Sequence, residues 1–113
     1  MNGWADVVAF ALTLPGVERG SSYGQPAVTV DGKAFASTGR EPGSFHVRSM
    51  HEEKAVLLET DPDTFWQTAH YEKWPGLLVR FGAADPERVR LVLTRAWWDA
   101  AKARTRSIAG ERP

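Results

Sequence analysis

Apolar residues at the start of the chain recur every three or four positions, which is the spacing of one face of an α-helix. The apolar positions are Trp4, Val7, Val8, Ala11 and Leu12. Asn2 is a candidate N-cap, and Leu14-Pro15-Gly16 is a stop signal. The pattern therefore predicts an amphipathic helix over residues 3–13.

Further along, apolar and polar positions alternate with a period of two, as they do in strands that bury one face. The clearest run is Ala27-Val28-Thr29-Val30, which the pair Asp31-Gly32 follows directly. An Asp-Gly pair after such a run is typical of a two-residue hairpin turn. We expect antiparallel strands over residues 27–30, 33–38 and 44–48, and another over 77–81.

Helix signals follow the first three strands. Ser49 and Glu52 have the spacing of a capping box, which predicts a short helix over residues 54–58. Pro62 fits the first position of a second capped turn over 61–66, and a long loop over 68–76 follows it.

The last helix is the longest. Asp85-Pro86 opens it, and the apolar pattern carries it over residues 86–103. Residues 104–113 have no apolar period, so we expect them to fray.

These elements predict one domain over residues 1–103, of the α+β class. The expected architecture is a two-layer sandwich with N- and C-terminal helices on one face of a four- or five-stranded antiparallel sheet. The residues assigned to its core are Trp4, Val8, Val28, Val30, Phe35, Phe45, Val47, Val79, Phe81, Leu93 and Trp97.

Composition narrows the function classes. The 113 residues include 14 basic and 14 acidic residues, so the chain lacks the strongly basic balance typical of nucleic-acid-binding proteins. It has no cysteine, which excludes disulfides, thiolate metal sites and a catalytic thiol. The longest apolar stretch, residues 7–12, is too short to span a bilayer, and no signal peptide pattern precedes it. We expect a cytoplasmic protein with no cofactor.

Several segments resemble the MmcQ/YjbR-like family of small bacterial proteins. They are Leu14-Pro15-Gly16-Val17-Glu18, Ser22-Tyr23-Gly24-Gln25-Pro26, Lys33-Ala34-Phe35-Ala36, the run from Thr68 to Arg80 and the helix that opens at Asp85-Pro86-Glu87. The resemblance covers residues 4–103. It implies a CyaY-like fold, with terminal helices packed on an antiparallel sheet, and it carries a DNA-binding label that derives from a proposed double-wing hairpin arrangement.

The first candidate site lies on the outward face of the sheet. Strand alternation turns Phe45 and Val47 toward the helices and His46 and Arg48 away from them. The same rule turns Leu78 and Arg80 outward. If these strands are neighbours, His46, Arg48 and Arg80 converge on one surface that suits a phosphate or carboxylate. Alternatively they are ordinary solvated residues, paired with Glu41, Glu59 or Asp31.

The second candidate is the loop 68–76, where His70, Tyr71 and Trp74 supply an imidazole, a phenol and an indole. This composition suits stacking on a base or closure over a small ligand. Alternatively Tyr71 and Trp74 cover the sheet and His70 satisfies a backbone group. The backbone N–H groups of Ser21-Ser22-Tyr23-Gly24 could bind an anion, but the segment is interpreted chiefly as a tight turn. The three histidines lack metal-site spacing.

The third candidate is the last helix. Its buried stripe comprises Val89, Val92, Leu93, Ala96, Trp97 and Ala100. Leu91 and Trp98 fall on the far side, beside a ridge of positive charge formed by Arg88, Arg95 and Lys102. We expect Trp98 to be substantially exposed and to serve nucleic acid or a homodimer contact that includes Leu91. Alternatively this is a solvated face with Trp98 packed against a neighbouring helix.

Taken together, the sequence favours a non-enzymatic binding domain, for DNA as the resemblance implies. The alternative is a small anionic ligand held on the open sheet face. A third reading is an enzyme that uses His70 as an acid or base, although the sequence shows no nucleophile or orienting carboxylate beside it.

Overall fold

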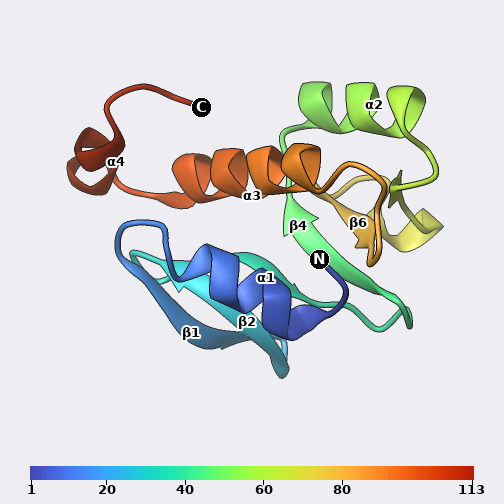
Figure 1. Ribbon diagram of the computed structural model, residues 1–113, viewed down its shortest axis with the longest axis horizontal. Helices are drawn as coiled ribbons and strands as arrows, with labels where there is room; N and C mark the ends of the chain where they lie inside the picture. The colour runs from blue at the N-terminus through green and yellow to red at the C-terminus, as the bar shows by residue number, and fades with distance from the viewer.

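The computed structural model describes all 113 residues and is of the predicted α+β class (Figure 1). Six antiparallel strands form one open sheet in the order β1-β2-β3-β4-β6-β5. The strands are β1 (Val17–Ser22), β2 (Gln25–Val30), β3 (Lys33–Thr38), β4 (Ser44–Arg48), β5 (Phe65–Trp66) and β6 (Gly76–Arg80). The helices are α1 (Trp4–Ala11), α2 (His51–Thr60), the 3-10 turn η1 (Ala69–Tyr71), α3 (Pro86–Ala100) and α4 (Ala103–Ala109).

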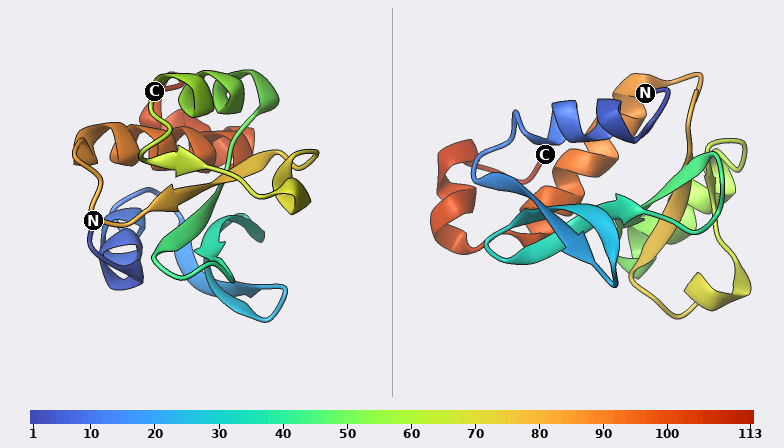
Figure 2. Two further views of the ribbon diagram at one scale, coloured as in Figure 1. Left: turned by 90° about the vertical axis from the view of Figure 1, so that its right-hand side faces the viewer. Right: turned by 90° about the horizontal axis from the view of Figure 1, so that it is seen from below.

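Helices α1 and α3 cover one face of the sheet, and α3 contacts β3 and β4 in its middle. Helix α2 lies beside α3 and contacts β5 and β6. In the right-hand view of Figure 2, α1 and α3 lie above the sheet and η1 lies below it. We call the face turned away from α1 and α3 the distal face.

The core lies between the sheet and these helices, as predicted. Of the eleven residues assigned to it, nine are buried, whereas Trp4 and Phe81 are partly buried against the cluster. Trp97 is fully buried, and its indole Nε1 donates a hydrogen bond to the carbonyl of Pro15 at 2.9 Å. All six stripe residues of α3 are buried, which confirms the helical phase.

Two hairpin turns position the strands. Asp31 and Gly32 both have positive φ, of 50° and 80°, which confirms the predicted turn between β2 and β3. Tyr23 and Gly24 repeat the same conformation between β1 and β2, with φ of 50° and 78°. The β2–β3 hairpin uses the favoured Asp-Gly pair, whereas the β1–β2 hairpin places a bulky tyrosine in the left-handed region.

Some element boundaries differ from the prediction. Strand β1 was not expected, because its sequence Val-Glu-Arg-Gly-Ser-Ser has one apolar residue in six and lies at a charged sheet edge. The expected capped turn over 61–66 ends in the short strand β5. The expected N-caps at Asn2 and Ser49 are also wrong, since Gly3 and Met50 occupy those positions without side-chain caps. By contrast, Asp85 caps α3 as expected, accepting from the Arg88 amide at 3.1 Å.

The C-terminal residues are ordered by contacts with α3 and α2. The last helix, expected over 86–103, ends at Ala100, and residues 104–109 of the segment expected to fray belong to α4. Arg106 donates to the Trp98 carbonyl at 2.7 Å, and the Arg112 guanidinium bridges Asp99 and Glu53. The hydrogen bond with Asp99 is the main reason that the pKa of Arg112 is raised. No helix in the structure has both the length and the apolar composition needed to cross a membrane.

Candidate functional site

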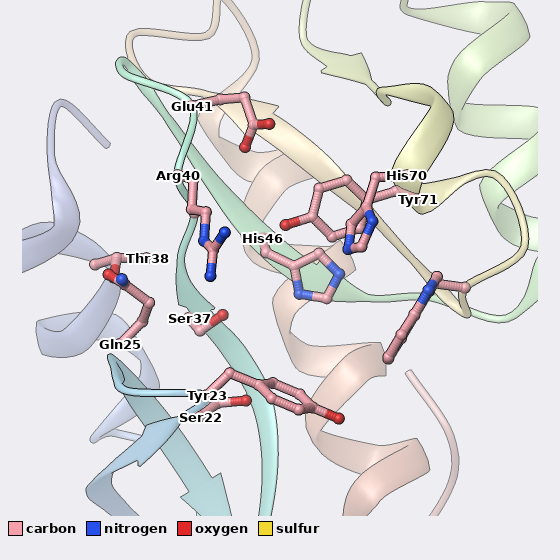
Figure 3. Close-up of a pocket in the computed structure, with 12 residues that line it drawn as sticks. Ser22, Tyr23, Gln25, Ser37, Thr38, Arg40, Glu41, His46, His70 and Tyr71 are labelled. Carbon is pink, nitrogen blue, oxygen red and sulfur yellow. The ribbon is translucent and has the colours of Figure 1, made fainter.

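The distal face carries a cavity of about 500 Å³ (Figure 3). It lies between the β1–β2 hairpin tip, the end of β3 with the loop after it, and the loop 67–75, which we call the aromatic loop. Its lining residues are Ser22, Tyr23, Gln25, Ser37, Thr38, Gly39, Arg40, Glu41, His46, His70, Tyr71 and Trp74. The volume is within the range of small-molecule sites.

Strand register builds the floor of this cavity. Ser37 of β3 lies directly opposite His46 of β4, and His46 lies opposite Leu78 of β6. Facing residues of antiparallel strands share a face, so all three belong to the distal face. Leu78 lies on the outward face as expected, but it is fully buried there. The distal face is covered at this point, and the Leu78 side chain packs beneath Gly39.

His46 is the central side chain of the floor. Its ring stacks on Tyr71, with centroids 5.0 Å apart and planes 25° apart. Its Nε2 atom is buried without a partner and lies against Gly76, where a Cβ would overlap it. Burial and, secondarily, the charge of Lys54 lower the pKa of His46 to about 4. His46 is therefore neutral at pH 7, with one nitrogen protonated.

A buried lysine holds the aromatic loop in place. The Lys54 ammonium donates to the carbonyls of Tyr71 at 2.6 Å, Trp74 at 2.9 Å and Glu72 at 3.4 Å. The residue is only 4% exposed, and this burial lowers its pKa, although Glu72 acts in the opposite direction. Since backbone carbonyls satisfy the ammonium, α2 fixes the course of the loop that closes one side of the cavity.

Aromatic side chains surround the mouth of the cavity. The rings of His70 and Trp74 stack with centroids 6.1 Å apart, and Tyr23 meets Trp74 edge to face at 6.3 Å. Tyr23 is 87% exposed and Trp74 is 44% exposed. Burial, with a further contribution from Glu41, raises the pKa of Tyr71, so its hydroxyl is a proton donor at pH 7.

Five buried side-chain polar atoms have no hydrogen-bond partner. They are Glu41 Oε2, His46 Nε2, Ser49 Oγ, Gln67 Oε1 and Thr68 Oγ1. All five belong to β4, the residues flanking it or the start of the aromatic loop. Such atoms are rare in folded proteins, and two of the five, on Glu41 and His46, belong to residues that line the cavity.

One guanidinium, that of Arg40, lines the cavity. Arg40 is exposed, and its guanidinium makes no hydrogen bond or ion pair with the protein. Glu41 beside it has one carboxylate oxygen buried near Gly39 and Leu78. Arg40 therefore keeps its donor fork free for a ligand anion.

The structure brings together four of the residues singled out from sequence, and these are His46, His70, Tyr71 and Trp74. The strand parity that placed His46, Arg48 and Arg80 on one face is also right. The prediction that Arg48 and Arg80 converge is wrong. In the β4–β6 register Arg48 lies opposite Gly76, whereas Arg80 lies opposite Ser44 at the other end of β4. Four residues of strand separate them by about 13 Å.

Arg80 is engaged elsewhere. Its Nη1 donates to the Pro62 carbonyl at 3.0 Å, and its guanidinium lies over the Trp66 ring, 4.8 Å from the centroid. The Trp66 indole in turn donates to Ser44 Oγ at 3.0 Å. Arg80 thus holds β5 and the turn before it against the sheet.

The three cations expected to form a ridge on α3 make separate contacts instead. Arg88 donates to Thr60 Oγ1 and lies over the Phe65 ring, and Arg95 donates to the carbonyl of Pro113 at 3.0 Å. Lys102 lies beyond the end of α3, where its amide nitrogen donates to Asp31. This hydrogen bond is the main reason that the pKa of Asp31 is lowered.

The expected exposure of Trp98 is wrong. Its ring packs against the core cluster, and the Arg106 guanidinium of α4 lies over it at 5.6 Å. The error follows from α4, which the sequence pattern did not reveal. Leu91 remains exposed at 39%.

Sequence reasoning missed Gln25, Ser37 and Arg40 as site residues, and it assigned Tyr23 to a tight turn. Each comes from a segment that is unremarkable alone, and only the pairing of β3 with β2 and β4 assembles them. The available signal was Tyr23 itself, a bulky residue in a predicted turn before glycine. The structure gathers no group of three acidic, histidine or cysteine side chains able to hold a metal ion.

The family model described as YjbR matches residues 12–98, which include the whole cavity. No curated protein matches the chain.

Proposed function

The chain belongs to the YjbR family, and we propose that it is a binding protein for a small anionic ligand held in the distal-face cavity. The observation that carries the proposal is Arg40, an unpaired guanidinium at the rim of a cavity rich in hydrogen-bond donors. Arginine offers a planar donor fork that matches carboxylates and phosphates.

The polar lining supports the same function. Hydroxyl groups of Ser22, Ser37 and Tyr71 can each donate to an anion. Gln25 accepts a hydrogen bond from Thr38 at 2.9 Å through its Oε1, which leaves its amide NH₂ group free to donate. An anion can therefore draw on these neutral donors together with the Arg40 guanidinium.

Binding is better supported than catalysis. A nucleophile needs a hydrogen-bonded base and usually a third group that orients the base. Neither His46 nor His70 makes a side-chain hydrogen bond to another residue of the cavity. The Gln25–Thr38 contact is the one side-chain pair bonded within the lining.

Nucleic-acid binding remains a prediction with less support. Two of the three ridge cations, Arg88 and Arg95, hydrogen-bond within the protein. A phosphate backbone is bound through many free cations, and its affinity falls steeply between about 50 and 200 mM salt. A ligand held by Arg40 and neutral donors should show a much shallower dependence.

The test uses calorimetric titration with four probes: benzoate, cyclohexanecarboxylate, phenyl phosphate and cyclohexyl phosphate. We expect at least one probe to bind wild type and to lose at least about fivefold in affinity in Arg40→Gln, because a charge-assisted contact is removed. The matched control Lys33→Gln removes an exposed cation from the β2–β3 hairpin and should bind as wild type does. Failure of all four probes, or binding that survives Arg40→Gln, would overturn the proposal.

A further inference from the structure

Two aromatic side chains at the cavity mouth, Tyr23 and Trp74, are exposed to solvent rather than buried in the core. Tyr23 is 87% exposed and Trp74 is 44% exposed, yet they meet each other at 6.3 Å. They come from segments about fifty residues apart in sequence, the β1–β2 hairpin tip and the aromatic loop. Exposed aromatic surface of this kind is typical of binding sites.

The backbone at Tyr23 gives a second, independent observation. Its φ of 50° lies in the left-handed region, which glycine, asparagine and aspartate tolerate and which bulky residues disfavour. The equivalent position of the next hairpin is Asp31, the favoured residue type. Backbone strain of this kind clusters at ligand sites. The strained turn directs a large ring toward the cavity, as Figure 3 shows.

The third observation concerns His46, whose neutral ring has one nitrogen protonated. Its Nε2 is sealed against Gly76 with no partner. We assign the proton to Nδ1, because a proton on Nε2 would be a buried N–H donor without an acceptor. The ring projects into the cavity between Arg40 and Tyr23 (Figure 3), and Nδ1 is the ring nitrogen that is not sealed. With this tautomer the floor presents a neutral N–H donor between Arg40 and the aromatic residues of the mouth.

From these observations we infer that the ligand is an aromatic acid, a planar ring that carries a carboxylate or phosphate group. This inference rests on the proposed function and adds the ring to it. The carboxylate or phosphate binds Arg40, and the His46 Nδ1–H donates to one of its oxygens. The ring packs against Tyr23 and Trp74.

The experiment compares planar probes with saturated probes of the same charge. Benzoate is matched to cyclohexanecarboxylate, and phenyl phosphate to cyclohexyl phosphate, so each pair differs only in the ring. We expect wild type to prefer the planar member of at least one pair by about tenfold, the scale of one or two aromatic contacts. The pair that shows the preference identifies the acidic group.

Variants at the mouth locate the preference. In Tyr23→Asn the backbone strain is relieved and the ring is lost, so the planar preference should fall to about twofold or less, with little change for the saturated probe. Tyr23→Phe keeps the ring and should keep the preference. Equal binding of planar and saturated probes by wild type would overturn the inference and leave the proposed function standing. Failure of all four probes would overturn the proposed function itself, and a preference unchanged in Tyr23→Asn would also overturn the inference.

Discussion

The state of His46 predicts how the protein loses stability in acid. Below pH 6.5 an unfolded chain protonates this residue, whereas the folded protein resists protonation until about pH 4. The unfolded state therefore binds more protons between these values, and the free energy of unfolding falls as the pH falls. The effect is absent well above pH 6.5 and complete below pH 4.

The magnitude follows from the shift. A pKa lowered from 6.5 to about 4 corresponds to roughly 3 kcal/mol once both states are protonated. Between pH 7 and pH 5 the predicted loss from this residue is about 2 kcal/mol. Protonation also places a second charge near Lys54, which already contributes to the shift.

The assay is urea unfolding of wild type and His46→Gln at pH 7 and pH 5, followed by far-UV circular dichroism. Because carboxylates also titrate in this range, the quantity of interest is the difference between the two proteins. Wild type should lose about 2 kcal/mol more than His46→Gln over this interval. His51→Gln, which removes a histidine from the exposed start of α2, is the control and should behave as wild type. Equal losses in wild type and His46→Gln would refute the reasoning.

Three further predictions concern packing and the site. Lys54→Met removes three carbonyl contacts and should cost about 2 kcal/mol, with faster amide exchange in the aromatic loop; an unchanged exchange pattern would show that the lysine does not hold the loop. Tyr23→Asn should raise the free energy of urea unfolding by roughly 1 kcal/mol, and a loss of stability would contradict the assigned strain. Trp97→Ala should cost roughly 3 to 5 kcal/mol, and a loss below about 1 kcal/mol would contradict its place in the core.

The sequence predicted the helix side of the molecule well, because its signals are local and periodic. The stripe of α3 that includes Trp97 follows from helical spacing alone, and the faces of Phe45 and Val47 follow from strand alternation. The β2–β3 turn follows from Asp31-Gly32. These features depend on neighbours within one element.

The distal face was harder to predict because it depends on contacts between elements. Parity placed Arg48 and Arg80 on one face, but only the β4–β6 register shows how far apart they lie. Leu78 is buried because a loop covers it, and Trp98 is covered because α4 folds back over it. Neither loop closure nor tertiary cover has a periodic signature in sequence.

The proposed function places the ligand in the distal-face cavity. It is tested most directly by following the backbone amides of the ¹⁵N-labelled protein by NMR as benzoate or phenyl phosphate is added. The largest shifts should fall on amides near Ser37, Arg40 and Trp74, with little change along α3. Shifts centred on α3, or no shifts with either compound, would contradict it.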